Sequence, residues 1–293
     1  MTETGGLLLV HAHPDDESIT TGGTIAHYRK QGVPVTVVTC TLGEEGEVIG
    51  ERWAGLVADQ ANQLGGYRIS ELTAALDAVG VASPNFLGGA GKWRDSGMAG
   101  TPSAANPRAF VNAGDEPIDA LTEVILTLKP QVVVTYDPNG GYGHPDHIRA
   151  HEITVAALER AAERGFDVPK FYWTVFDRDV LREHVAALVR RTVDELPGAL
   201  PDGWLLPVDA LVDYISTDAA TAVIDVSDVV GAKRAALRAH ATQVTVAPSG
   251  REYALSNNIA LPIMPVEHFV LARGKRGATG ADGLEHDLFA GLD

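Results

Sequence analysis

The chain has 293 residues, 45% of them hydrophobic, which is enough for one large α/β domain or a core domain with a smaller companion and excludes a disordered chain. Acidic residues outnumber basic ones by 39 to 23, and a net charge of −16 makes the chain a poor partner for nucleic acid or an anionic membrane. A single cysteine, Cys40, excludes an intrachain disulfide, and neither a signal-like leader nor a long apolar run occurs, so we expect a cytoplasmic protein.

The first half of the chain alternates short apolar runs with longer helix-like segments. Strands are predicted at Leu7–His11, Val35–Thr41, Asn85–Leu87, Val132–Tyr136 and Phe171–Phe176. Helices are predicted at Thr20–Gln31, Trp53–Leu64, Ser70–Val79, Pro117–Leu128 and Asp146–Arg164, with the Gly65-Gly66 pair separating two of them. Strands separated by helices indicate βαβ units. The fold class is therefore α/β, a Rossmann-like, mostly parallel sheet with helices on both faces.

The alternation weakens after about Asp177. The remaining elements are a helix at Leu181–Glu195, a strand at Thr221–Val226, a helix at Asp228–Ala241 and a strand at His268–Ala272. We therefore predict a Rossmann-like catalytic core over residues 1–176. Residues 177–293 are predicted to form a smaller C-terminal α/β elaboration that packs on this core.

Two similar tetrapeptides follow predicted strands. His13-Pro14-Asp15-Asp16 comes directly after the first strand, and His144-Pro145-Asp146-His147 follows Val132–Tyr136 through a glycine-rich loop. In both, proline stands where the first turn of a helix is expected. Ligands of open parallel sheets bind beyond the carboxyl ends of the strands, so the two boxes are expected to meet at one edge of the sheet.

The two boxes contain enough ligands for a metal ion. A hydrolytic site needs about three protein ligands and an open position for water. Asp16 and His147 occupy the matching fourth place of each box, and His13 lies three residues before Asp16, within reach of a tight turn. Two imidazoles and one carboxylate suit zinc, and they are also a ligand set of non-haem iron. The other polar residues of the boxes remain for proton transfer and orientation.

Simpler interpretations explain these motifs less well. Each box alone could be a proline-initiated helix start capped by aspartate, but two boxes at the same kind of strand end argue against this. The segment Gly88–Trp93 is not a phosphate loop, because Phe86 stands where glycine is required and Trp93 where serine or threonine is required. No Gly-x-Gly-x-x-Gly follows the first strand, so dinucleotide binding has no support.

The segment Ala12–Glu17, together with the second box, resembles the LmbE-like (PIG-L) zinc de-N-acetylases. Other stretches resemble the branch of this family that removes acetate from N-acetylglucosaminyl-inositol in mycothiol biosynthesis, namely Thr41–Gly50, Trp93–Gly100, Tyr136–His147, His240–Gln243 and Leu255–Leu261. The resemblance runs from about residue 7 to the C-terminus and is strongest in the first 150 residues.

This resemblance implies a metal-dependent amide hydrolase with one Zn²⁺ per chain, or Fe²⁺ in its place. His13, Asp16 and His147 would hold the metal, and Asp15 would be the general base that takes a proton from water. The implied partner is a small amino-sugar–inositol substrate, with no nucleic acid and no membrane.

Five further residues receive roles from the resemblance. His144 would act as an acid or as an electrophilic stabiliser of the oxyanion, with Asp146 orienting it. Tyr142 would help to polarise the carbonyl from a mobile glycine-rich loop. Arg68 and Asp95 would bind sugar or inositol hydroxyls, although taken alone they are typical of a surface cation and a turn carboxylate. Outside this set, a packing role is expected for two other histidines, His11 and His240.

Three alternatives stay open. A mycothiol S-conjugate amidase would share both boxes, but Ile19 and Gly143 stand where the amidase pattern has lysine and proline, which favours the deacetylase. A non-catalytic sugar-binding module with a relic metal site would not need the spare carboxylate of Asp15. A non-haem iron oxygenase would have no use for a hydrolytic base.

Overall fold

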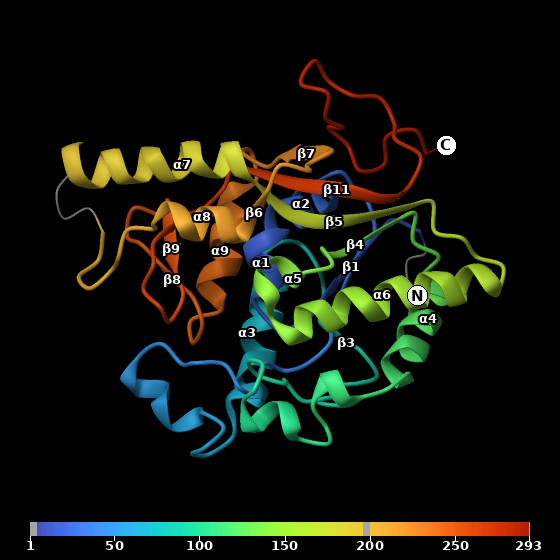
Figure 1. The fold of residues 1–293 in the computed structure, drawn as a ribbon, viewed down its shortest axis with the longest axis horizontal. Coiled ribbons are helices and arrows are strands. Elements are labelled where there is room, and N and C mark those ends of the chain that lie inside the picture. The colour runs from blue at the N-terminus through green and yellow to red at the C-terminus, as the bar shows by residue number, and fades with distance from the viewer. Residues whose placement is uncertain (1–4, 196–199, 293) are drawn as a thin grey trace.

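A computed structural model describes residues 5–195 and 200–292 as an α/β fold around one large sheet (Figure 1). The strand order is β3-β2-β1-β4-β5-β11-β7, and β6 pairs with β5. The bounds are β1 Leu7–His11, β2 Val35–Thr39, β3 Asn85–Phe86, β4 Val132–Tyr136, β5 Lys170–Asp177, β6 Ser216–Thr217, β7 Ala222–Asp225 and β11 Val266–Gly274. The strands β1 to β6 pair in parallel, and β11 runs antiparallel to β5 and β7. The predicted mostly parallel, Rossmann-like sheet is confirmed.

Helices cover both faces of the sheet. They are α1 Asp16–Thr20, α2 Gly22–Lys30, α3 Leu64–Ala78, α4 Glu116–Leu128, α5 Gly140–Gly143, α6 Pro145–Glu163, α7 Arg178–Arg190, α8 Asp209–Ile215 and α9 Val230–Ala239. Alternate residues of β1 enter two separate cores: Leu8 and Val10 pack with α4 and α6, whereas Leu7 and Leu9 pack with α2, α3 and α9. Burial on both faces explains why the strands read as continuous apolar runs.

Residues beyond 176 extend this architecture. The predicted boundary falls inside β5, and β11 and β7 from the later segment join the same sheet. The C-terminal segment reaches β5 through the buried carboxylate of Glu285, which accepts hydrogen bonds from Lys170 Nζ at 2.6 Å and Tyr172 Oη at 2.9 Å. A small antiparallel sheet, β10-β9-β8, also forms here, from β8 Thr245–Val246, β9 Glu252–Ala254 and β10 Leu261–Pro262. In the described part of the chain, no helix has the length and apolar character needed to cross a membrane.

Two predicted helices are wrong in their extent. The segment predicted as Thr20–Gln31 is divided into α1 and α2 at Thr21, whose φ of −137° is not helical. The segment predicted as Trp53–Leu64 contains a 3-10 turn at Glu51–Leu56, none of whose residues is buried, and its last residue, Leu64, begins α3. Without an apolar face against the core, a short helix gains too little packing to be stable.

The Gly65-Gly66 pair was predicted to separate two helices, but both glycines lie inside α3, which begins at Leu64. Gly65 is buried against the loop that precedes α3. A Cβ atom at Gly65 would lie 2.7 Å from Glu44 Cγ and 2.9 Å from Leu42 Cβ, whereas one at Gly66 would meet nothing within 4 Å. Gly65 therefore permits close packing of the helix rather than ending it.

Alanine at these two adjacent positions is expected to change stability in opposite directions. Gly65→Ala should lower the free energy of unfolding by about 1–3 kcal/mol, because the added methyl group overpacks the contact with the loop. Gly66→Ala should raise it by roughly 0.4–1 kcal/mol, because alanine restricts the unfolded chain and fits an exposed helical position. Chemical denaturation of both variants would measure the difference, and a similar shift for both would contradict the packing role of Gly65.

Candidate metal centre and cleft

The two boxes lie at the carboxyl ends of the adjacent parallel strands β1 and β4. In the first box, the chain closes a tight turn in which His13 N donates a hydrogen bond to Asp16 Oδ2 at 2.9 Å. In the second, His144 is the N-cap of α6, and its Nδ1 accepts a hydrogen bond from the backbone N–H of Asp146 at 3.1 Å. The boxes therefore meet at one edge of the sheet, as the topology predicts.

The predicted metal ligands converge at this edge. His13 Nδ1 lies 3.4 Å from Asp16 Oδ2, and His147 Nε2 lies 3.3 Å from both Asp16 Oδ1 and His13 Nδ1. Ligand atoms of a tetrahedral ion with bonds near 2.0–2.1 Å lie roughly 3.3 Å apart, so the spacing of these groups suits zinc, with a different oxygen of Asp16 nearest to each histidine. All three side chains are buried. Two overlapping trios also come close enough to share an ion: His13, His144 and His147, and His13, Asp95 and Asp146.

The contacts of His13 distinguish between these trios. Its Nε2 lies 3.2 Å from Asp146 Oδ2 and 3.5 Å from Asp95 Oδ1. A carboxylate that holds one ring nitrogen of a ligating histidine leaves the other nitrogen for the metal. The Nδ1 of His13 is thus available on the side of Asp16 and His147, which argues against the trio with Asp95 and Asp146 and leaves the trio predicted from the two boxes as the candidate.

The electrostatics of this position favour a cation. Burial acts to lower the pKa of His13, but the carboxylates of Asp95, Asp146 and Asp16 outweigh it and hold this pKa well above its ordinary value. A positive charge is therefore stabilised between these groups, whether a proton or a metal ion supplies it. One oxygen of Asp146, Oδ1, is buried without a hydrogen-bond partner among the described residues.

The structure places the Asp146 carboxylate differently from the expectation that it orients His144. Its Oδ2 contacts His13 Nε2 and accepts a hydrogen bond from Ser96 N at 2.9 Å. Only the backbone N–H of Asp146 reaches His144. The side chain of Asp146 therefore orients His13, a predicted metal ligand, and the helix start orients His144.

Asp15 lies beside this centre in a strained backbone conformation. Its φ of 126° is unusual for any residue other than glycine. Its backbone N–H donates to Glu17 Oε2 at 2.9 Å, and its Oδ2 lies 3.1 Å from Arg68 Nη2. Burial raises the pKa of Asp15 to about 6, although the Arg68 guanidinium opposes this shift. Observed strain at a carboxylate with a raised pKa points to a functional position.

Arg68 and Asp95 both line the cleft, but their polar atoms are largely engaged by the protein. Arg68 is buried in α3, where Nη1 donates to Gly43 O at 2.8 Å and Nη2 donates to Pro14 O. Asp95 accepts hydrogen bonds from Gly97 N at 2.8 Å and Glu45 N at 3.2 Å. The observed role of Arg68 is to hold Asp15 and the turn of the first box.

His144 and Tyr142 flank the metal ligands from the second box and the loop before it. Burial, followed by His13 and His147, lowers the pKa of His144 to about 3, so this ring is neutral. Because Nδ1 accepts the hydrogen bond from the Asp146 backbone, the proton of the neutral ring lies on Nε2. The Tyr142 ring meets His147 edge-on with 5.1 Å between centroids, and its side chain is 42% exposed.

The glycines around Tyr142 have the backbone freedom that the sequence predicts for a mobile loop. Gly141 and Gly143 adopt φ angles of 73° and 85°, which side-chain-bearing residues rarely take. The loop is nevertheless tied to α8, because Tyr214 Oη donates a hydrogen bond to Tyr142 O at 2.6 Å.

Tyr136 is a site residue that sequence reasoning missed. Its hydroxyl donates to Asp16 Oδ2 at 2.7 Å and accepts from Ala12 N at 2.8 Å. Its ring stacks on His147 with 4.2 Å between centroids. Only its place as the last residue of a strand that leads to a box could have indicated this role.

The two histidines expected to pack in the core are both fully buried, and both make polar contacts. His11 Nε2 lies 3.0 Å from Thr21 Oγ1. His240 Nε2 lies 2.8 Å from Glu17 Oε1, the same carboxylate that holds the backbone of Asp15. His240 therefore supports the site indirectly as well as filling space.

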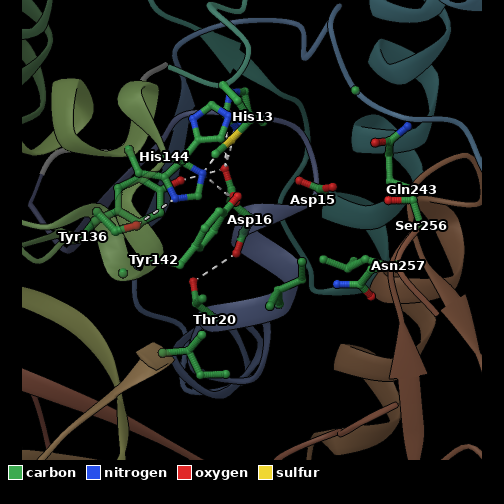
Figure 2. A pocket seen from close by; sticks show the side chains of 18 of the residues that line it. His13, Asp15, Asp16, Thr20, Tyr136, Tyr142, His144, Gln243, Ser256 and Asn257 are labelled. Carbon is green, nitrogen blue, oxygen red and sulfur yellow. Dashed lines mark hydrogen bonds and ion pairs between the residues drawn. The ribbon is translucent and has the colours of Figure 1, made fainter. Parts of the chain in front are cut away.

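A cleft of about 640 Å³ opens over these groups, within the usual size range of ligand pockets. Figure 2 shows His13, His144 and Tyr142 on one side of it and Gln243, Ser256 and Asn257 on the other, with Asp15 between them. The cleft is thus lined by residues from both halves of the chain. The apolar part of its lining includes Ile19, Val175, Phe176, Leu211, Ile215, Leu255, Ile259 and Leu261.

Comparisons with known proteins give consistent results. The family model described as PIG-L, GlcNAc-PI de-N-acetylase, matches residues 8–158. A protein of Nocardia farcinica, named 1D-myo-inositol 2-acetamido-2-deoxy-alpha-D-glucopyranoside deacetylase, is 71% identical over 100% of this chain and 98% of its own length. A Rhodococcus erythropolis protein of the same name is 60% identical over 98% of this chain and 97% of its own.

Among solved structures, GalB, the 4-carboxy-2-hydroxymuconate hydratase of Pseudomonas putida KT2440, superposes with a TM-score of 0.56 at 18% identity. The match covers 95% of this chain and 100% of that one. At this identity the likeness concerns the fold alone.

Proposed function

Because the chain belongs to the PIG-L family of GlcNAc-PI de-N-acetylases, we propose that it hydrolyses the N-acetyl group of 1D-myo-inositol 2-acetamido-2-deoxy-α-D-glucopyranoside, a step of mycothiol biosynthesis. The products are acetate and the free amino sugar. The observation that carries the proposal is the convergence of both boxes on one buried donor trio, in a chain 71% identical to a relative of that name. We further propose that the enzyme acts in the cytoplasm.

The donor trio fits Zn²⁺, and its two imidazoles and one carboxylate suit Fe²⁺ as well. His13 Nδ1, Asp16 and His147 Nε2 would hold the ion, with Asp146 and Tyr136 fixing the first two ligands from behind. Bound there, the ion would supply an activated water and an electrophile for the amide carbonyl.

Asp15 fits the role of general base. A carboxylate with a pKa of about 6 is ionised at neutral pH and is still basic enough to accept a proton from the attacking water. The same carboxyl group can then return this proton to the nitrogen of the leaving amine. The ion pair with Arg68 and the hydrogen bond from its backbone to Glu17 fix the carboxylate during both transfers.

The neutral state of His144 favours one of the two roles that the sequence left open. A ring with a pKa of about 3 has no second proton to give to the amine at neutral pH. With its proton on Nε2, it can instead donate a hydrogen bond to the carbonyl oxygen as negative charge develops there. Tyr142, whose phenol keeps its proton because burial raises its pKa, is a second donor for this oxygen.

The proposal is tested by measuring acetate and amine release from this substrate, with apo and metal-reconstituted protein and with a mycothiol S-conjugate run in parallel. We expect release that requires metal and is faster on the acetamide. Faster release from the S-conjugate would keep the chemistry and change the assignment to the amidase. No release from either, together with metal and ligand binding, would favour the sugar-binding module and contradict the proposal.

A further inference from the structure

The cleft extends well beyond the residues that would act on the acetamide group. Its far wall has no role in the proposed hydrolysis. The amide must reach the donor trio, so the sugar ring that bears it lies beside Asp15, and the rest of the substrate lies farther along the cleft. Figure 2 places Gln243, Ser256 and Asn257 on that farther side. These residues belong to the His240–Gln243 and Leu255–Leu261 stretches, which have no assigned function.

Gln243 is a buried amide with one unused acceptor. Its Nε2 donates to Thr242 O at 3.1 Å and to Thr242 Oγ1 at 3.2 Å, whereas its Oε1 has no hydrogen-bond partner among the described residues. The side chain is only 8% exposed, yet it lines the cleft. An acceptor that has no partner in the protein and lies at the wall of the cleft is open to water or to a ligand hydroxyl.

The surroundings of Gln243 hold this acceptor in place and keep the space before it open. Thr242 donates from its backbone N and from Oγ1 to the buried carboxylate of Glu71, at 2.8 and 2.7 Å. On the other side lies Gly46, where a Cβ atom would come within 2.7 Å of Gln243 Oε1 and 2.8 Å of Arg68 Nη1. Any side chain at position 46 would therefore fill the space that a ligand hydroxyl needs.

Hydrogen-bond donors lie along the same wall. Tyr253 of β9 is 5% exposed and lines the cleft, and its hydroxyl has no partner in the described parts of the chain. Burial, and then the Asp15 carboxylate, raise the pKa of Tyr253, so the phenol stays protonated. Asn257 uses its Oδ1 to accept a hydrogen bond from Ile259 N at 3.0 Å, which leaves its amide hydrogens for a ligand.

The charge of the cleft restricts the kind of ligand that this wall can take. The carboxylates in the lining are those of Asp15, Asp16, Glu45, Glu47, Asp95 and Asp137. Arg68 is the only Lys or Arg among the described lining residues, and Asp15 and two backbone carbonyls already engage its guanidinium. These carboxylates would repel an anionic ligand. A neutral polyol suits the wall formed by Gln243, Tyr253 and Asn257, because its hydroxyl groups both donate and accept hydrogen bonds.

Apolar residues of the lining, among them Phe176, Leu211 and Ile215, offer the hydroxyl groups of such a ring no hydrogen-bond partner. We propose that Gln243, Tyr253, Ser256 and Asn257 form the subsite for the cyclitol ring of the substrate, with Gly46 keeping it open. This inference rests on the proposed deacetylase function and assigns one wall of the cleft to substrate selection.

The test compares two substrates that differ only in this ring. The first is the inositol glycoside, and the second is methyl 2-acetamido-2-deoxy-α-D-glucopyranoside, which lacks the cyclitol. For Gln243→Leu, kcat/KM on the inositol glycoside is expected to fall about 10- to 100-fold, mainly through KM, because a polar contact is lost. On the methyl glycoside the change is expected to stay within about 2-fold, since no such contact exists to lose. The zinc content should equal that of the wild type.

Asn257→Ala and Gln60→Leu complete the set. Asn257 lies in an exposed turn, so its truncation leaves the fold intact and should give the same substrate-dependent loss. Gln60 is exposed and lies outside the cleft lining, so Gln60→Leu should match the wild type on both substrates. Equal losses on both substrates, or no loss on either, for the Gln243 and Asn257 variants would overturn the subsite.

Failure of the proposed function would be recognised separately, because the wild type would then hydrolyse neither substrate. Calorimetric titration of zinc-loaded wild type and Gln243→Leu with both glycosides would then decide on the subsite alone. Weaker binding of only the inositol glycoside by the variant supports the assignment. Equal binding of that glycoside by the two proteins overturns it.

Discussion

Replacing Asp15 with asparagine is expected to lower kcat for acetamide hydrolysis about 100- to 10,000-fold, the usual contribution of a positioned general base. Asparagine has nearly the same shape, can accept the contact from Arg68 and tolerates an unusual backbone angle, so fold and metal content should be preserved. Its amide cannot take a proton from water. Single-turnover kinetics of the metal-loaded variant would measure the loss directly.

A matched control for this experiment is Asp59→Asn, a substitution of the same kind at an exposed residue outside the cleft lining. It should leave kcat unchanged. Loss of bound metal from the Asp15 variant would mean that Asp15 is a ligand. Near-normal turnover with full metal content would contradict its role as the base.

Replacing His147 with alanine is expected to remove both tight metal binding and turnover. His147 Nε2 is one corner of the candidate trio and lies 3.3 Å from both His13 Nδ1 and Asp16 Oδ1. Changing a residue that only hydrogen-bonds to a metal ligand usually lowers metal affinity roughly 10- to 100-fold, and Asp146→Asn is the variant that represents this case. The loss of metal affinity in His147→Ala should be larger. Elemental analysis after dialysis against a weak chelator would compare the metal content of the wild type, His147→Ala and Asp146→Asn.

Thermal unfolding gives a second measurement of the same variant. At a free metal concentration about 1,000 times Kd, bound metal stabilises the wild type by about 4 kcal/mol, so zinc should raise its Tm. Zinc should not raise the Tm of the His147 variant. His286→Ala, which removes a half-exposed histidine paired with Asp282, should respond to zinc like the wild type. An unchanged zinc response of the His147 variant would exclude it as a ligand.

The sequence predicts correctly that the two boxes meet, because a general rule of sheet topology determines where they lie. Once the runs Leu7–His11 and Val132–Tyr136 are recognised as parallel strands, the boxes that follow them must lie at the same edge. The ligand trio then follows from residue type and spacing. Recognising two short strands of β-branched and aliphatic residues was therefore sufficient to predict that residues 13 and 147 lie close together.

Contacts that depend on tertiary packing could not be predicted in this way. Tyr136 reaches Asp16 across 120 positions of sequence, and His240 reaches Glu17 across 223. Neither residue type nor spacing marks these pairs. The same limit explains Gly65, since a glycine that ends a helix and a glycine that admits a neighbouring loop are identical in sequence, and only the position of Glu44 distinguishes them.

The two sides of the cleft come from different stretches of the chain. The donor trio, Asp15 and His144 all lie within residues 13–147, whereas Gln243, Tyr253 and Asn257 lie within residues 243–257. A mutation in the later stretch can therefore alter which molecule is held without touching the atoms that break the amide bond. After gene duplication, a daughter enzyme could acquire a new substrate through changes confined to that stretch while inheriting its hydrolytic machinery intact.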